Sequence, residues 1–202
     1  MLEFSCFNRK PDGTPIVCDA EIMAYAENQI WDYDPELLKV PQKLDALQFV
    51  ENYLNTTVEV QDIKYTMSGR EVSGITVLKE ADVSVCEDGE IIEKRFPAGT
   101  IIIDETIMGR GDGYELFTIC HEAGHFCIHF PAFYGSDILA ARSTMDKIMC
   151  RSNMIGSERT GNKRWTDRDF MEHHANIYAA ALLMPRPSFV PFVQESQQKS
   201  RI

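Results

Sequence analysis

The sequence has no long hydrophobic run and nothing that resembles an export signal. The longest nearly apolar stretch, Ala175 to Met184, covers ten residues, whereas a membrane-spanning helix needs about 20. The first residues, MLEFSCFNRK, lack the basic start and apolar core of a secretory signal. We therefore expect a soluble cytoplasmic protein that does not contact membranes.

Paired cysteine motifs are also missing. The six cysteines are scattered along the chain, and no two of them form a C-x-x-C pair. A chain of 202 residues with 44% apolar residues can build a core without covalent cross-links. We therefore expect the thiols to be reduced.

Positive charge is scarce, with 20 basic against 31 acidic side chains and a formal net charge of −11. Such a chain has no long-range attraction to nucleic acid, so direct nucleic-acid binding is not expected. The glycine-rich segment 109–113 lacks the Lys-Ser/Thr pair that completes a phosphate-binding loop. We expect a plain loop there.

The hydrophobic patterning predicts an α+β protein. Helical periodicity dominates residues 1–55, whereas residues 56–110 contain short alternating segments separated by turn signals such as Asp88-Gly89. These predict N-terminal helices followed by a small, mostly antiparallel sheet. Asp112 and Glu115 resemble a capping box for a buried helix that ends before Pro131.

The motif that carries chemistry is His121-Glu122-Ala123-Gly124-His125, an H-E-x-x-H sequence on this buried helix. Four helical residues turn the chain by about 400°, so both imidazoles lie on one face about 6 Å apart and can reach one Zn²⁺. Glu122 is then placed to accept a proton from a water on the metal. The alternative is an ordinary amphipathic helix, but buried histidines and a buried glutamate need partners, and a metal supplies one.

A hydrolytic zinc site needs a third protein ligand. The extended metzincin motif is excluded, because Ile128 and Pro131 stand where it requires Gly and His. The remaining strong helix, residues 169–184, offers Glu172, with Asn176 on the same face to hydrogen-bond a ligand histidine. His174 is the leading alternative ligand, although it projects about 200° away from Glu172.

These two motifs together resemble the ImmA/IrrE family of metallo-endopeptidases, whose pattern is an H-E-x-x-H helix followed by E-x-x-A-N-x-F-A-x-x-L-L-M-P. Residues 172–185 read EHHANIYAAALLMP, with Tyr178 in place of the usual Phe. The resemblance covers residues 15–190. The chain departs from the family in a long insert before Glu172 and shows no helix-turn-helix module.

The resemblance implies a minimal zincin-like metallopeptidase fold and zinc-dependent cleavage of a protein substrate, a bacterial helix-turn-helix transcriptional repressor. It does not fix the identity of that repressor. We expect a single domain over residues 1–202 that binds one Zn²⁺ per chain. Its expected parts are the helical region 1–55, the sheet 56–110, the H-E-x-x-H helix 112–130, an insert 131–168, the third-ligand helix 169–184 and a tail 185–202.

Three nearby residues have simpler interpretations. His129 lies one turn beyond His125 and is expected beside the ligands, not among them, because a fourth protein ligand would close the site to water. Cys120 and Cys127 are expected to be small apolar core residues. The donor that stabilises the oxyanion is not determined: Tyr134, Tyr114, Arg110 and His174 are all candidates.

The insert has a net positive charge, unlike the long acidic part of the chain before it. Residues 135–168 contain seven bases and four acids, whereas residues 1–134 carry a large acidic excess. Both ends of the insert adjoin metal-bearing helices, so it is predicted to wall the cleft and to recruit an acidic protein segment through Arg159, Lys163 and Arg164. The alternative is a solvated loop that pairs with the acidic body.

The predicted reaction is peptide-bond hydrolysis with Glu122 as the general base and proton donor to the leaving amine. A rival from another class stays open. The protein could be a zinc-stabilised regulator that binds a repressor or senses a signal without cutting. Cleavage by the wild type but not by Glu122→Gln would separate the two.

Overall fold

The structure is a computed structural model of the chain, and it describes residues 1–4, 8–11, 14–63, 71–111, 113–134, 145–151 and 165–199. Helices and strands are mixed, as the α+β prediction requires. The helices are α1 (Asp19–Tyr33), η1 (Pro35–Leu38), α2 (Ala46–Gln48), η2 (Phe49–Tyr53), η3 (Glu105–Ile107), α3 (Tyr114–Gly124), η4 (His125–His129), α4 (Phe130–Phe133), α6 (Asp167–Leu183) and α7 (Arg186–Lys199). The strands are β1 (Val58–Gln61), β2 (Val72–Val77), β3 (Ala81–Glu87), β4 (Glu90–Phe96), β5 (Ile101–Asp104) and β6 (Lys147–Arg151).

The strands form two sheets, not one. Four of them pair in the order β1-β5-β2-β6, with β1 parallel to β5 and the other pairs antiparallel. β3 and β4 form a separate hairpin. Its two-residue turn is the predicted Asp88-Gly89, and both residues have positive φ, as the tightest hairpin turns require.

β6 is a strand that the sequence did not predict. Lys147–Arg151, within the insert 131–168, form an edge strand of the sheet, with Cys150 opposite Gly74. The predicted substrate-binding residues Arg159, Lys163 and Arg164 lie outside the described residues, so this expectation stays a prediction.

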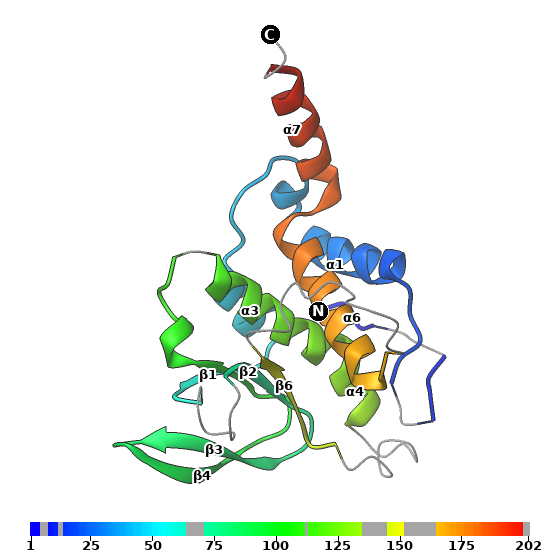
Figure 1. Cartoon of the computed structure of the whole chain (residues 1–202). Helices are drawn as coiled ribbons and strands as arrows, with labels where there is room; N and C mark the ends of the chain where they lie inside the picture. Colours follow the sequence, from blue (N-terminus) through cyan, green and yellow to red (C-terminus); the bar gives the residue numbers. More distant parts are fainter. Residues whose placement is uncertain are drawn as a thin grey trace.

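The elements pack in layers (Figure 1). Side chains alternate between the two faces of β5. Ile101 and Ile103 therefore face the helices, where the largest core cluster lies, and Ile102 faces the β3-β4 hairpin. α3 lies between the sheet and α6, and α6 packs in turn against α1 (Figure 1). The sheet on one side and α6 on the other explain why α3 is apolar nearly all round.

The H-E-x-x-H helix runs further than predicted. After α3 the chain makes a π-helical turn, η4, in which the Phe130 N–H donates to the His125 carbonyl, and it then continues as α4 to Phe133. Pro131 therefore does not end the helix. In a regular α-helix a proline ring clashes with the preceding turn. The hydrogen bonds of a π turn join residues five apart instead of four, and this wider turn leaves room for the ring of Pro131.

The start of this helix also differs from the prediction. Gly113, with φ of 82°, is the N-cap residue in place of Asp112, which lies outside the described residues. Glu115 does not close a capping box. Its carboxylate accepts a hydrogen bond from the Gly109 N–H at 2.8 Å, so it fixes the preceding loop.

α6 and α7 complete the chain. α6 begins two residues earlier than predicted, with Thr166 and Asp169 forming its capping box. The expected tail contains the helix α7, which extends away from the body of the molecule (Figure 1). Within the described residues, no helix is long and apolar enough to span a membrane.

A buried hydrogen bond ties α6 to α1. The Tyr178 hydroxyl donates to the Gln29 Oε1, and both side chains are fully buried. Tyr178→Phe is expected to lower the free energy of unfolding by about 1–3 kcal/mol, because the Gln29 oxygen loses its donor without gaining water. Urea unfolding measures this change.

The matched control is Tyr53→Phe. The Tyr53 hydroxyl donates to Asp32 at an exposed site. There water replaces the lost partner, so a change within about 0.5 kcal/mol is expected. Equal losses in the two variants would contradict the assignment of the buried bond to stability.

Candidate metal centre

Three buried side chains from two helices converge on one point. The Nε2 atoms of His121 and His125 are 3.1 Å apart, and the Glu172 Oε2 lies 3.3 Å from the first and 3.8 Å from the second. All three side chains are almost completely buried. Tetrahedral ligands at bond lengths of about 2.0–2.2 Å are about 3.3–3.6 Å apart, so these atoms have the spacing of a ligand set.

The polar atoms of this group fit a cation. Both oxygens of Glu172 are buried, and among the described residues they have no hydrogen-bond partner; the Arg168 Nε stands 3.8 Å from Oε1. The His121 Nδ1 faces the Asn176 Oδ1 at 3.0 Å. Because an amide oxygen can only accept, Nδ1 donates, so Nε2 is the nitrogen of this ring that is left to bind a metal.

Two of the three side chains hold the protonation that a metal needs. The third does not: burial would lower the pKa of His121, but charge and hydrogen bonding from Cys150 and Glu172 raise it well above its usual range, so this ring has to release a proton when a metal binds. Burial lowers the pKa of His125 to about 4, against the opposing effect of Glu172, so its imidazole is neutral at pH 7. Burial alone would raise the pKa of Glu172, but the adjacent ring nitrogens of His121 and His125 hold it below its usual range. A neutral imidazole and an ionised carboxylate are the forms that bind metals.

A close helix contact brings the ligands together. A Cβ added at Gly124 would lie 3.0 Å from the Ala175 Cα and 3.3 Å from the Ala175 carbonyl oxygen. The absence of a side chain at Gly124 and the small one at Ala175 thus let α3 and α6 approach. Glu172 reaches the two histidines across this contact.

Gly124→Ala is expected to destabilise the protein by about 1–3 kcal/mol through overpacking. Helix propensity favours alanine by about 1 kcal/mol. However, two of the nearest atoms belong to the Ala175 backbone, and the third belongs to the fully buried ring of Tyr178, so they cannot easily move aside. Urea unfolding and the metal content of the purified variant measure the effect. A gain in stability of the size that propensity alone gives would contradict the close approach.

Glu122 points from the same helix toward the sheet. Thr76 on β2 donates to its Oε2 at 2.6 Å, while its Oε1 is buried and has no hydrogen-bond partner among the described residues. Gly74 makes room for it, since a Cβ there would lie 2.7 Å from Oε1. Burial raises the pKa of Glu122 to about 7, with His121 and Thr76 opposing the rise.

A row of buried imidazoles extends behind the ligands. The His125 Nδ1 lies 2.9 Å from the His129 Nδ1, and the His129 Nε2 lies 3.4 Å from the His174 Nδ1. His129 thus stands behind His125, in contact with its far nitrogen. His174, the alternative third ligand, contacts His129 and is not part of the converging group with Glu172.

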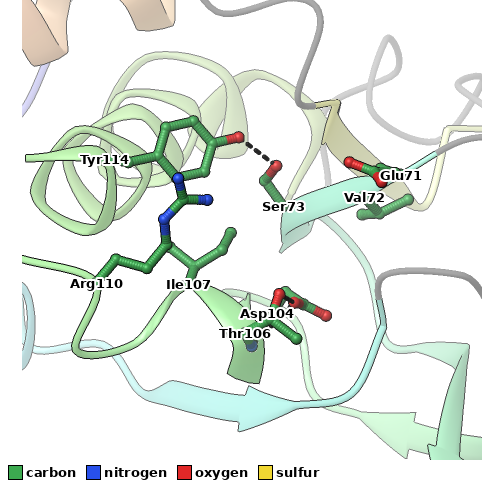
Figure 2. A pocket seen from close by; sticks show the side chains of 8 residues that line it. All are labelled: Glu71, Val72, Ser73, Asp104, Thr106, Ile107, Arg110 and Tyr114. Carbon is green, nitrogen blue, oxygen red and sulfur yellow. Dashed lines mark hydrogen bonds between the residues drawn. The ribbon is translucent and has the colours of Figure 1, made fainter. Parts of the chain in front are cut away.

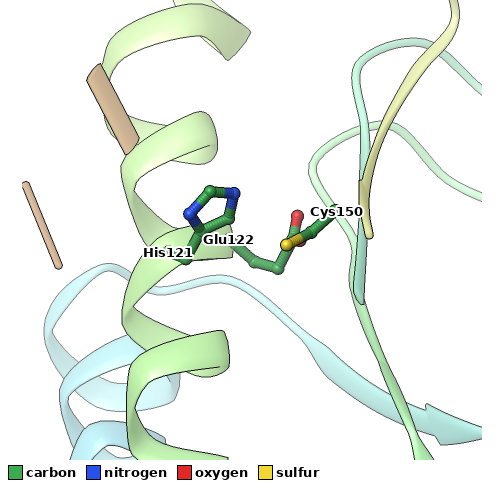
Figure 3. A group of neighbouring side chains, drawn as sticks. All are labelled: His121, Glu122 and Cys150. Atoms are coloured by element: carbon green, nitrogen blue, oxygen red, sulfur yellow. The ribbon is translucent and has the colours of Figure 1, made fainter. Parts of the chain in front are cut away.

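Cys150 was not predicted as a site residue. Within the described residues, two groups have ligand atoms close enough to share a metal: His121, His125 and Glu172, and His121, Glu122 and Cys150. The second group is drawn in Figure 3. Cys150 lies 25 positions beyond His125, in a polar stretch, and its place in the sheet depends on pairing with β2, so no local sequence signal marks it.

Two candidate oxyanion donors lie at a separate pocket. Tyr114 precedes His121 by two helical turns, about 10 Å along the axis. Its hydroxyl lies 2.7 Å from the Ser73 Oγ, and the Arg110 guanidinium stacks over its ring. These side chains line a cavity of about 190 Å³ (Figure 2). Tyr134 is exposed after α4.

Comparison with protein-family models, with curated proteins and with solved structures finds no match to this chain.

Proposed function

We propose that the protein is a zinc-dependent endopeptidase with a minimal zincin-like site. The observation that carries the proposal is the buried, converging group of His121, His125 and Glu172. Beside it lies a carboxylate oxygen of Glu122 that has no hydrogen-bond partner in the described part of the chain. Two imidazoles and one carboxylate are the ligands of many hydrolytic zinc sites, which keep one position open, whereas structural sites use four protein ligands.

When bound, Zn²⁺ supplies Lewis acidity, lowering the pKa of a coordinated water and polarising the scissile carbonyl. The chain's own residues supply proton transfer and positioning. Thr76 holds the Oε2 of Glu122, which leaves Oε1 as the atom that takes a proton. A pKa of about 7 lets this carboxylate accept the proton and later release it to the leaving amine.

Asn176 and His129 position the ligands. Each lies against the Nδ1 of one ligand histidine, at 3.0 Å from His121 and 2.9 Å from His125. Such partners hold the ring orientation and the tautomer that exposes Nε2. The contacts have the form of the outer hydrogen bonds that accompany histidine ligands in zinc sites.

The substrate class is proposed from the motif resemblance to the ImmA/IrrE family. We propose a helix-turn-helix transcriptional repressor as the substrate, cut without any contact between this chain and DNA. The net charge of −11 supports the absence of contact with DNA, because an acidic chain is not attracted to nucleic acid.

The test is incubation of the zinc-loaded protein with the repressor encoded nearest to its gene. New fragments that disappear with a chelator and return with added Zn²⁺ are the expected result. A repressor that leaves DNA but stays intact would favour the rival function, a zinc-stabilised regulator that acts by contact. A repressor that neither leaves DNA nor is cut would contradict both.

A further inference from the structure

Cys150 places a buried thiol beside the proposed metal ligands. Its strand, β6, pairs with β2 so that Cys150 stands opposite Gly74, and paired residues face the same side of a sheet. That side is the one from which Thr76 holds Glu122. The Cys150 sulfur, the Glu122 carboxylate and a ring nitrogen of His121 all lie within 4.8 Å of one another.

The thiol and the metal ligands share one nitrogen. Asn176 engages the Nδ1 of His121, which leaves Nε2 for both groups, and Figure 3 shows that edge of the ring turned toward Cys150 and Glu122. A tetrahedral zinc site puts a nitrogen and a thiolate sulfur about 3.5 Å apart. In this structure Cys150 belongs to the group with His121 and Glu122 and not to the group with His125 and Glu172. To act as a fourth ligand its sulfur therefore has to move toward His125 and Glu172 as well as toward His121.

A second observation distinguishes Cys150 from a core cysteine. The neighbouring Glu122 Oε1 is fully buried and has no hydrogen-bond partner among the described residues, so a proton acceptor stands next to the thiol. The register of β2 against β6 also shifts between Val72 and Gly74. Bulges of this kind re-aim side chains beside active sites.

We propose that Cys150 is a switchable fourth ligand that closes the metal site in a latent state. The inference rests on the proposed function, because it needs the metal at His121, His125 and Glu172. On closing, the S–H bond breaks, its proton passes to Glu122 Oε1, and the sulfur lone pair forms the bond to the metal. On opening, Glu122 returns the proton and water takes the vacated position, so no electrons are exchanged.

The closed state has four protein ligands, two nitrogens, one oxygen and one sulfur, as in structural zinc sites, which exclude water. It also occupies the proton acceptor. A single movement of β6 therefore removes both the open position and the free base that hydrolysis requires.

Cobalt substitution tests the proposal, because thiolate bound to Co²⁺ gives a charge-transfer band in the near ultraviolet. The band is expected in the wild type and absent in Cys150→Ala. The matched control is Cys120→Ala, which removes an equally buried thiol that belongs to neither ligand group; it is expected to keep the band. Competition with a chelator should show metal affinity lower by at least about 10-fold in Cys150→Ala, the lower limit seen when even an outer partner is lost.

The outcomes separate the two proposals. Visible cobalt absorption without the charge-transfer band in the wild type would overturn the role of Cys150 alone. No cobalt absorption at all would overturn the metal site and, with it, the role of Cys150. A charge-transfer band that persists in Cys150→Ala would also overturn the role of Cys150. Cys150→Ser keeps the side-chain size and is expected to lose the band too, which serves if the alanine variant does not fold.

Activity gives an independent check. At equal metal content, Cys150→Ala is expected to hydrolyse substrate at least as fast as the wild type, because it has no latent state. A slower variant that still binds the metal would overturn the role of Cys150 as a closing element.

Discussion

Glu122→Gln is expected to lower kcat for peptide hydrolysis by about 10²- to 10⁴-fold, the usual contribution of a positioned general base. The amide keeps the size of the side chain and can still accept from Thr76, but it cannot take a proton. The three proposed ligands are untouched, so metal content should stay at one ion per chain. Single-turnover kinetics and elemental analysis measure the two quantities on the same preparation.

The control is Glu115→Gln, the same change on the same helix. The Glu115 carboxylate contacts the Gly109 N–H and not the metal group, and the amide oxygen can still accept that bond. Its activity is expected to stay near that of the wild type. Hydrolysis at the wild-type rate by Glu122→Gln would remove Glu122 from the mechanism, and equal losses in both variants would point to a structural effect.

Glu172→Ala is expected to abolish high-affinity metal binding and the stabilisation that comes with it. A ligand that binds the folded state at 1,000 times its dissociation constant stabilises that state by about 4.1 kcal/mol. In the wild type, added Zn²⁺ should therefore raise the unfolding temperature strongly, whereas the variant should unfold at the same temperature with and without the metal. Calorimetry with Zn²⁺ and with a chelator measures the difference.

Glu195→Ala is the matched control. Glu195 is exposed on α7, and its loss should leave the full response to Zn²⁺. A Glu172→Ala protein that still gained stability from Zn²⁺ would show that the third ligand is a different side chain, and His174→Ala would then be the next variant to examine.

Local sequence patterns predicted much of the architecture. The helical periodicity within residues 1–55 agrees with α1 at Asp19–Tyr33, and Asp88-Gly89 predicted the turn of the β3-β4 hairpin, because helical faces and two-residue turns are short-range features. The spacing of His121 and His125 predicted that their rings share a face, and the structure places their Nε2 atoms 3.1 Å apart. Glu172 stands with them, on the helix that the sequence singled out.

Long-range pairing was the part that local patterns could not give. β6 is five residues long within a polar stretch, and only its ladder with β2 makes it a strand. The division of the predicted strands into a mixed sheet and a hairpin has the same origin. Residue periodicity also could not predict the π turn at His125–His129. Such a turn adds a single residue to one helical turn and requires no particular residue type.

The contact between α3 and α6 can form only late in synthesis, because the two helices are far apart in the sequence. His125 leaves the ribosome 47 residues before Glu172, which is about 2–10 s at 5–20 residues per second. During that interval the nascent chain presents two histidines on an apolar helix whose covering partner has not yet been made. A metal ion that bound then would find only two of the three proposed ligands, so the proposed site is complete only after α6 has been synthesised.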